Sequence, residues 1–244
     1  MRKMRLDRLL SRNGSSRKEA AALVKAGRVT VDGRAVHDAS MQIDLDSARV
    51  CLDGAPLRTS KHLHLMINKP AGVLTATQDP RGQATVADYL PRSFLALDIG
   101  PVGRLDRDVT GLVLMTTDGQ LAHRLISPRW EQDKIYVARV EGRLTESDAV
   151  RMAEGIELKD FTCAPAKLEI LEAGEDESLC EVTVHEGKYH QVKRMLGALG
   201  HPVTALHRRS IAGIELDGAL EAGQWRELTE AEKAHLYNVT DLEE

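Results

Sequence analysis

Residues 103–114 read GRLDRDVTGLVL, a glycine turn with several charges followed by the apolar run of a buried strand. Asp106 and Asp108 both stand on the turn, directly before that run. A carboxylate at the mouth of a buried strand either caps a loop that faces water or is held in place to react. The stretch therefore predicts a core strand and, in front of it, a candidate reactive carboxylate.

The sequence around this stretch, from residue 62 on, mixes strand and helix patterns without the strict alternation of a parallel α/β fold. Strand patterns are found near 62–67, 110–117, 134–142, 166–173 and 179–187. Helix patterns are found near 85–90, 120–127, 145–155, 189–200 and 229–237. This order predicts an α+β domain over residues 62–244.

A different pattern fills residues 1–61. A short helix is predicted over 4–10, and Ser16 with Glu19 forms a capping box that begins a second, basic helix. Two dipeptides typical of hairpin turns follow, Asp32–Gly33 and Asp53–Gly54. Together these signals predict a small separate N-terminal domain that ends in a linker.

The charge of the chain is divided between the same two parts. Residues 1–61 carry 13 Lys and Arg against 7 Asp and Glu, a balance of +6. Residues 62–244 carry 20 against 30, a balance of −10. Small domains fluctuate in charge, but a positive domain with positive charge gathered along one helix is typical of a protein that binds a polyanion.

Composition excludes several classes of protein. No apolar run is long enough to cross a membrane, and the basic start has no apolar segment behind it, so no secretory signal is predicted. The three cysteines are far apart and form no C-x-x-C pair, which indicates free thiols in a reducing cytoplasm. Nine histidines occur without an H-E-x-x-H pattern, and no nucleotide-binding glycine motif is present. The sequence therefore predicts no metal and no cofactor.

The N-terminal pattern of helix, turn, basic helix and hairpin resembles the alpha-L RNA-binding domain of a small-subunit ribosomal protein and a bacterial tyrosyl-tRNA synthetase. The resemblance implies contacts with structured RNA through its shape and phosphates. The side chains expected to make these contacts are Arg5, Arg8, Arg17, Lys18 and Arg28.

The opening stretch is similar to the G-R-L-D-x-x-T-x-G-L signature of the pseudouridine synthases that modify ribosomal RNA. Three further segments of that family follow in the family's order: NKPAG at 68–72, KIY at 134–136 and EGKYHQVKRML at 186–196. The resemblance covers nearly the whole chain. It implies a catalytic domain with a mixed, largely antiparallel sheet behind the alpha-L domain.

The resemblance also assigns roles in the reaction. Asp106 occupies the position of the family's catalytic aspartate, which acts as a nucleophile or a base near the ribose. Arg104, on the same loop, is expected to orient Asp106 and keep it ionised. Lys193 occupies the position of the basic residue that pairs with the aspartate. Arg194 is the reserve choice and a further RNA contact, since adjacent helical residues differ in direction by roughly 100°.

An unpaired or flipped uracil needs an aromatic partner, and the chain has only two Trp, four Tyr and two Phe. Tyr136, in the family's K-x-Y position, is expected to stack on the uracil. Tyr189 is the second choice, and Trp130 is expected along the path of the RNA. Asp108 is interpreted as a solvated or capping acid.

Within the family, the motifs most resemble the branch that acts on small-subunit 16S rRNA, where the resemblance implies uridine 516 in conventional rRNA numbering. The expected partner is ribosomal RNA, in particular 16S rRNA within a small-subunit assembly particle, and the protein is expected to be a monomer. Two alternatives stay open. One is a sibling enzyme that acts on 23S rRNA or tRNA, and the other is a non-catalytic RNA-binding assembly factor.

Overall fold

The computed structural model describes residues 3–45 and 47–243. The chain divides into two compact units. The first runs through Leu63 and also takes in Pro91–Asp98, a segment that the sequence assigned to the second domain. The second comprises His64–Leu90 and the residues from Ile99 on. Within the described residues, every helix is too short or too polar to span a bilayer.

The first unit is built from three short helices and six short strands in its described part. They are β1 (Lys3–Arg5), α1 (Leu6–Arg12), α2 (Arg17–Lys25), β2 (Val29–Val31), β3 (Arg34–Ala35), β4 (Gln42–Asp44), β5 (Val50–Leu52), β6 (Ala55–Pro56) and α3 (Arg92–Leu95). The strands form a four-stranded sheet in the order β3-β2-β5-β6 and a separate β1-β4 pair.

Local signals in this unit act as the sequence predicts. The Ser16 side chain accepts a hydrogen bond from the Glu19 backbone, and the Glu19 carboxylate accepts one from the Ser16 backbone, so the capping box is confirmed. Asp32 and Asp53 both adopt a φ of 51° ahead of a glycine, as two-residue hairpin turns require. The leucines of α1 and Val24 of α2 are fully buried and pack against the strands.

The second unit contains the remaining elements. They are β7 (His64–Lys69), η1 (Val86–Tyr89), β8 (Gly100–Pro101), β9 (Thr110–Thr116), α4 (Gly119–Ile126), η2 (Pro128–Trp130), β10 (Lys134–Glu141), α5 (Glu146–Glu154), β11 (Lys167–Ala173), β12 (Glu177–Val184), α6 (Gln191–Ala198), β13 (Val203–Ile211), β14 (Ile214–Glu215), β15 (Trp225–Glu227) and α7 (Glu230–Val239).

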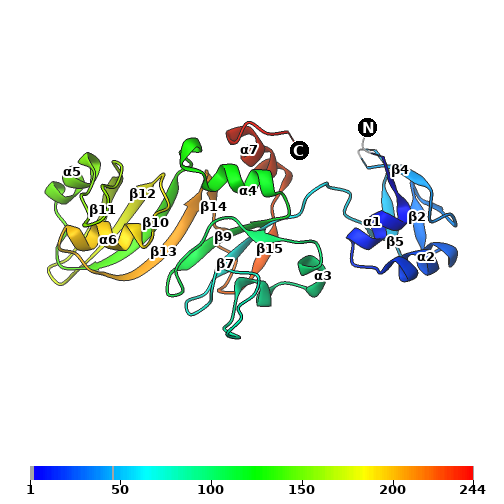
Figure 1. Ribbon diagram of the computed structural model, residues 1–244, viewed down its shortest axis with the longest axis horizontal. Coiled ribbons are helices and arrows are strands. Elements are labelled where there is room, and N and C mark those ends of the chain that lie inside the picture. The colour runs from blue at the N-terminus through cyan, green and yellow to red at the C-terminus, as the bar shows by residue number, and fades with distance from the viewer. Residues whose placement is uncertain (1–2, 46, 244) are drawn as a thin grey trace. The chain divides into compact units, whose positions relative to one another are not determined.

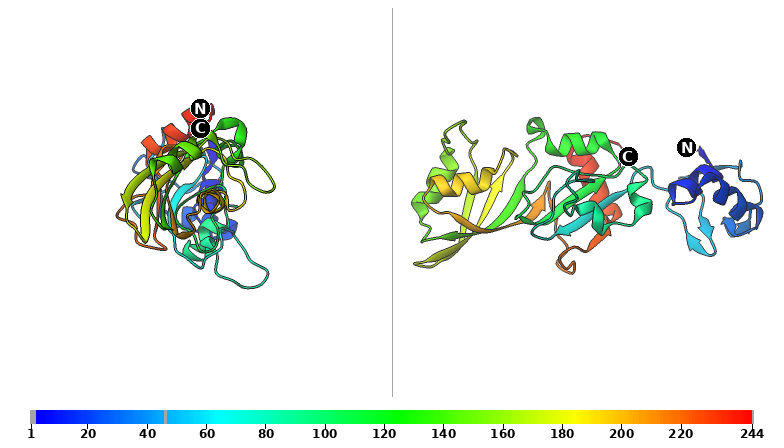
Figure 2. Two further views of the ribbon diagram at one scale, coloured as in Figure 1. Left: turned by 90° about the vertical axis from the view of Figure 1, so that its left-hand side faces the viewer. Right: turned by 60° about the horizontal axis from the view of Figure 1, so that its bottom comes forward.

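One large sheet organises this unit, in the order β11-β12-β10-β13-β9-β7-β15, with β14 beside β13 and β8 beside β9. Among the described strands of this sheet, β9 and β13 form the parallel pair and the other pairs are antiparallel. The predicted α+β class with a mixed, largely antiparallel sheet is confirmed. Figures 1 and 2 show α6 lying against the β10–β12–β13 half, while α4 lies beside β9 in the other half.

The central strand β13 is absent from the sequence prediction. It follows Pro202 and carries His207, Arg208 and Arg209 in a row, a pattern that hides the usual alternation of a strand. Its pairing with β10 also shifts register twice. The strand forms because β10 and β9 flank it and bury Arg208, which is 2% exposed.

The parallel junction between β9 and β13 brings two backbones into close contact. The register pairs Gly111 with Arg208, and the Arg208 Nε donates to the Leu112 carbonyl at 2.8 Å. A Cβ on Gly111 would lie 2.8 Å from the Arg208 backbone nitrogen and still closer to its carbonyl oxygen. Gly111 also has a φ of 102°. Only glycine fits this junction without moving the strands apart.

The loop of residues 103–109, which leads into β9, is fastened by the segment after β7. Thr75 Oγ1 donates to the Leu105 carbonyl at 2.9 Å and accepts from the Leu105 backbone at 3.1 Å. The Gly72 backbone donates to the Arg107 carbonyl at 2.8 Å. The Lys69 ammonium donates to the same carbonyl at 3.1 Å. These hydrogen bonds fix the loop backbone at Leu105 and at Arg107.

Lys69 is a fully buried lysine, with 0% of its surface exposed. Burial lowers its pKa to about 8, although the carboxylates of Asp108 and Asp106 act in the opposite direction. An unfolded chain keeps this proton up to about pH 10.5. Between these two values the unfolded state binds more protons than the folded state, so the free energy of unfolding rises with pH.

We predict that Lys69→Met removes this part of the pH dependence. From pH 8 to pH 10, the wild type should gain about 2 kcal/mol of unfolding free energy relative to the variant. Urea unfolding followed by tryptophan fluorescence measures it, because Trp130 and Trp225 both lie in the unit that contains Lys69. Lys18→Met, at an exposed position, is the control and should follow the wild type. Parallel wild-type and Lys69→Met profiles would contradict the prediction.

Candidate active site

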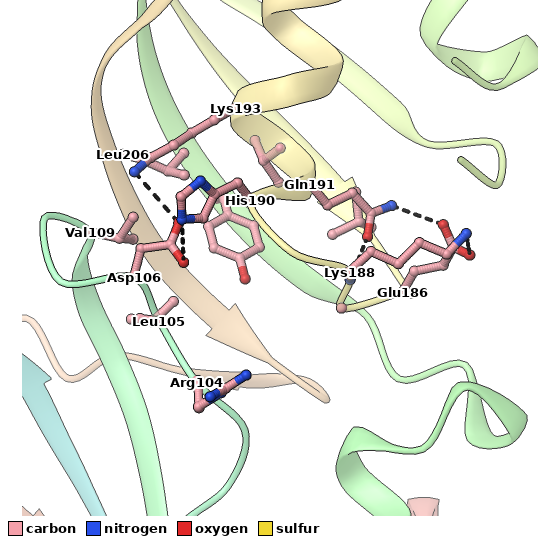
Figure 3. A pocket seen from close by; sticks show the side chains of 14 residues that line it. Arg104, Leu105, Asp106, Val109, Glu186, Lys188, His190, Gln191, Lys193 and Leu206 are labelled. Atoms are coloured by element: carbon pink, nitrogen blue, oxygen red, sulfur yellow. Dashed lines mark hydrogen bonds and ion pairs between the residues drawn. The ribbon is translucent and has the colours of Figure 1, made fainter. Parts of the chain in front are cut away.

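A pocket opens where the loop 103–109 meets helix α6 and the strands β10 and β13 (Figure 3). Its lining residues are Arg104, Leu105, Asp106, Val109, Tyr136, Val184, Glu186, Gly187, Lys188, His190, Gln191, Val192, Lys193 and Leu206. Four predicted reaction residues line this pocket: Arg104 and Asp106 from the loop, Tyr136 from β10 and Lys193 from α6.

Asp106 lies between two nitrogen-bearing side chains that come from the α6 end of the pocket. Lys193 Nζ is 3.5 Å from Asp106 Oδ2, and His190 Nε2 is 3.5 Å from Asp106 Oδ1. Figure 3 shows both side chains pointing at the carboxylate. The Asp106 side chain is 28% exposed, so a bound molecule can still reach it. The arrangement keeps a carboxylate beside a cation without closing it off from the pocket.

Asp108 competes with Asp106 for the same lysine. Both Asp108 oxygens accept hydrogen bonds from Lys193 Nζ at 2.7 Å, shorter than the 3.5 Å to Asp106. This hydrogen bond lowers the pKa of Asp108. Its side chain is 74% exposed, as expected for a solvated acid. Its contact with Lys193 is one that the sequence did not indicate.

Arg104 lies in the pocket without the expected contact to Asp106, and its role stays a prediction. It lines the pocket, but among the described residues its guanidinium has no ion pair with Asp106, and Figure 3 shows it apart from that carboxylate. The cationic contact with Asp106 comes from Lys193 on α6.

Lys193 and Arg194 point in different directions, as helix geometry predicts. The Arg194 guanidinium forms an ion pair with Asp160 and lies 4.9 Å from the centre of the Phe161 ring. Lys193 alone of these two faces Asp106. Arg194 therefore contacts the loop beside α6, and its predicted contact with RNA stays a prediction.

The aromatic candidates occupy distinct places. Tyr136 is partly buried on β10, paired with Val182 of β12 and Arg208 of β13, and it lines the pocket. Trp130 packs under the Arg124 guanidinium, 4.6 Å from its ring centre, and does not line this pocket.

His190 is a pocket residue that the sequence reasoning missed. It precedes α6 with a φ of 51°, which is uncommon for a residue with a side chain, and its ring stacks on Tyr189 at 3.8 Å between centroids. Its place within the family segment EGKYHQVKRML was the sequence signal that could have identified it as a pocket residue. Lys69 and Thr75, which fasten the loop, were also missed, although NKPAG marked the neighbourhood of Lys69.

The five N-terminal candidates for RNA contact are all exposed: Arg5, Arg8, Arg17, Lys18 and Arg28. Two of them form ion pairs, Arg5 with Asp7 at 2.7 Å and Arg28 with Asp53. Arg8 and Arg17 line one surface hollow with Arg5. Like Lys18, these two have no ion-pair partner among the described residues.

The pocket can support chemistry at a carbon that carries a leaving group. A carboxylate acts there as a nucleophile or a general base. The nearby ammonium of Lys193 stabilises negative charge, and the ring of Tyr136 offers a flat apolar face to a planar group. The described lining combines these groups in one place, which is suited to a sugar joined to a planar base.

Comparison with known proteins identifies the chain. Residues 63–198 match the sequence profile of the family described as RNA pseudouridylate synthase, and residues 4–50 match the S4 domain. An uncharacterized RNA pseudouridine synthase of Bacillus subtilis is 42% identical, with 96% of this chain and 98% of the relative covered. The ribosomal small subunit pseudouridine synthase A of Escherichia coli is 41% identical over 95% of this chain and 99% of its own. The ribosomal large subunit pseudouridine synthase B of Bacillus subtilis is 35% identical, with 97% of both chains covered.

A solved structure agrees with these matches. The crystal structure of a pseudouridylate synthase superposes with a TM-score of 0.67 at 35% identity, and the match covers 96% of this chain and 99% of that one. The S4 match confirms the small N-terminal RNA-binding domain that the sequence predicts. With its profile match, its full-length relatives and its fold in agreement, the chain belongs to the RNA pseudouridylate synthase family.

Proposed function

We propose that this RNA pseudouridine synthase isomerises one uridine of 16S rRNA, uridine 516 by its resemblance, with Asp106 as the catalytic carboxylate. The 16S assignment is supported by the 41% identity over 95% of the chain to the small-subunit enzyme of Escherichia coli. The large-subunit enzyme of Bacillus subtilis, at 35%, makes 23S rRNA the alternative substrate.

The observation that carries the proposal is the position of Asp106. Its carboxylate lies 3.5 Å from both Lys193 Nζ and His190 Nε2, in a pocket that Tyr136 also lines. The carboxylate is on the loop of the G-R-L-D signature and is partly exposed. A group held in this way can react with a bound nucleoside.

The reaction conserves every atom of the nucleotide. The N1–C1′ bond of uridine breaks, the uracil turns, and a C5–C1′ bond forms while the C5 proton is removed and N1 gains a proton. No electrons are gained or lost overall, so the step needs no oxidant or reductant. Asp106 acts on the sugar or the base at this centre, with Lys193 Nζ 3.5 Å from its carboxylate.

A uridine inside a duplex cannot reach this pocket, so it enters flipped or already unpaired, at a cost of about a few kcal/mol. Tyr136 receives the uracil by stacking, since it is the tyrosine in the pocket lining of the described chain. Its hydroxyl is also available to handle the C5 proton.

The N-terminal S4 domain supplies the wider hold on RNA. Arg5, Arg8, Arg17, Lys18 and Arg28 contact phosphates of the 16S rRNA in a small-subunit assembly particle. The enzyme works as a monomer in this proposal.

We predict that Asp106→Asn lowers turnover at least about a thousandfold, or ~4 kcal/mol of barrier, because the amide keeps the shape but supplies no carboxylate. Asp108→Asn is the matched control on the same loop and the same lysine, and it should stay within about tenfold of wild type. Tritium release from 16S and 23S transcripts labelled at uridine C5 measures both the rate and the substrate. An Asp106→Asn enzyme within tenfold of wild type would exclude the assignment.

A second prediction concerns the S4 domain. Removing Arg8 and Arg17 together should flatten the slope of log affinity against log salt by roughly 1.4 to 1.8, because each phosphate contact contributes about 0.7–0.9. Arg143→Ala is the control, since this exposed arginine belongs to the second unit and pairs with Glu175. Binding of a 16S fragment across a salt series measures the slope. An unchanged slope in the double variant would show that these arginines do not contact phosphates.

A further inference from the structure

Tyr189 is unusually exposed for an aromatic residue of this chain. Its exposure of 73% is the largest among the exposed large hydrophobic residues described. The whole chain has only two Trp, four Tyr and two Phe. Leaving such a ring in water forgoes the burial that normally stabilises it. The position therefore calls for a reason other than packing in the free protein.

The exposure of Tyr189 does not come from a loose segment. The buried Gln191 accepts a hydrogen bond from the Lys188 backbone at 3.1 Å and donates to Glu186 at 2.9 Å. Glu186 in turn accepts from the Ala164 backbone at 3.0 Å. The residues on both sides of Tyr189 are thus fastened to their surroundings, and its ring is presented from a fixed base.

One face of the Tyr189 ring is covered and the other is available. The covered face stacks on His190, with centroids 3.8 Å apart and planes 18° from parallel. His190 itself lines the pocket, and its Nε2 is 3.5 Å from Asp106 Oδ1. Asp106, His190 and Tyr189 therefore form a series that runs from the reacting carboxylate to the outside of the pocket (Figure 3 shows the first two).

We propose that the open face of Tyr189 is a subsite for a nucleobase, the one directly next to the target uridine in the RNA. The inference rests on the proposed function. When one nucleotide enters a pocket, its neighbours stay at the mouth, and contacts with them help to set the sequence context. A flat aromatic face takes any base by stacking. Tyr136 receives the uracil inside, and Tyr189 holds the adjacent base one ring layer outside His190.

The experiment combines variants of Tyr189 with RNAs that lack one base. The RNA is a 16S fragment centred on the target uridine, intact or with an abasic nucleotide immediately 5′ or immediately 3′ of it. The proteins are the full-length wild type, Tyr189→Phe, Tyr189→Ala and, as a matched control, Tyr89→Ala. Tyr89 is another exposed tyrosine of the same unit, 39% exposed on η1, and it lies outside the pocket lining. Binding is measured as Kd at one salt concentration, and turnover of the intact fragment is measured separately.

Tyr189→Ala should raise the Kd for intact RNA about 5- to 150-fold, the range expected for one lost base stack. Tyr189→Phe should bind within about threefold of wild type, because phenylalanine keeps the ring that stacks on the base. Tyr89→Ala should also bind within about threefold, because Tyr89 makes no such stack in the proposal. The wild type should bind one of the two abasic RNAs as weakly as Tyr189→Ala binds the intact RNA. On that abasic RNA, Tyr189→Ala should not raise the Kd further.

Two results would overturn the subsite. One is wild-type affinity of Tyr189→Ala for intact RNA. The other is an equal loss on the intact RNA and on both abasic RNAs, which would mean that Tyr189 acts without a neighbouring base. The turnover measurement separates this failure from that of the proposed function. If the wild-type enzyme turns over the 16S fragment and either of these binding results is found, only the subsite is excluded. If the wild-type enzyme does not turn over the 16S fragment but the effect of Tyr189→Ala depends on a neighbouring base, only the 16S assignment is excluded.

Discussion

The parallel junction of β9 and β13 is the constraint on which the site depends. The loop of residues 103–109, which carries Asp106, leads into β9, whereas the strands β10 and β12 and the helix α6 belong to the other half of the sheet. The halves join where Gly111 meets Arg208, at a separation that excludes a Cβ. Arg208 is buried and hydrogen-bonded to β9 there, so the junction fixes the loop relative to Tyr136 and Lys193. A small shift between the halves would separate the carboxylate from its partners.

The charges at the pocket leave Asp106 near two nitrogen-bearing side chains and still partly exposed. A single ammonium, that of Lys193, serves two carboxylates, and the shorter contacts are to Asp108. The Lys193 ammonium is therefore farther from Asp106 than from Asp108. His190 Nε2 lies 3.5 Å from the other oxygen of Asp106. Beneath the loop, the buried Lys69 adds a further cation that fixes the backbone. The loop holds its two acids near these groups without burying either acid completely.

The sequence predicts those features that local rules or a dense motif determine. The Ser16–Glu19 capping box, the hairpin turns and Asp106 in its loop belong to this class, as does Lys193 rather than Arg194 as the cation near Asp106. Features that depend on tertiary contact were missed. The strand at 203–211 was missed because its charged residues hide the alternation of a strand. Arg208 is buried there between the neighbouring strands, which no local rule anticipates. Arg104 is close to Asp106 in sequence, but Figure 3 shows its side chain apart from that carboxylate.

The central claim is that this enzyme isomerises one 16S uridine through Asp106. The most direct test maps pseudouridine at single-nucleotide resolution in total RNA, using carbodiimide adducts that stop reverse transcription. The RNA comes from cells that lack the gene and from the same cells supplied with the wild-type or Asp106→Asn gene. The account predicts that one 16S pseudouridine disappears without the gene, returns with the wild type and stays absent with Asp106→Asn. Loss of a 23S or tRNA pseudouridine instead, or recovery with Asp106→Asn, would contradict it.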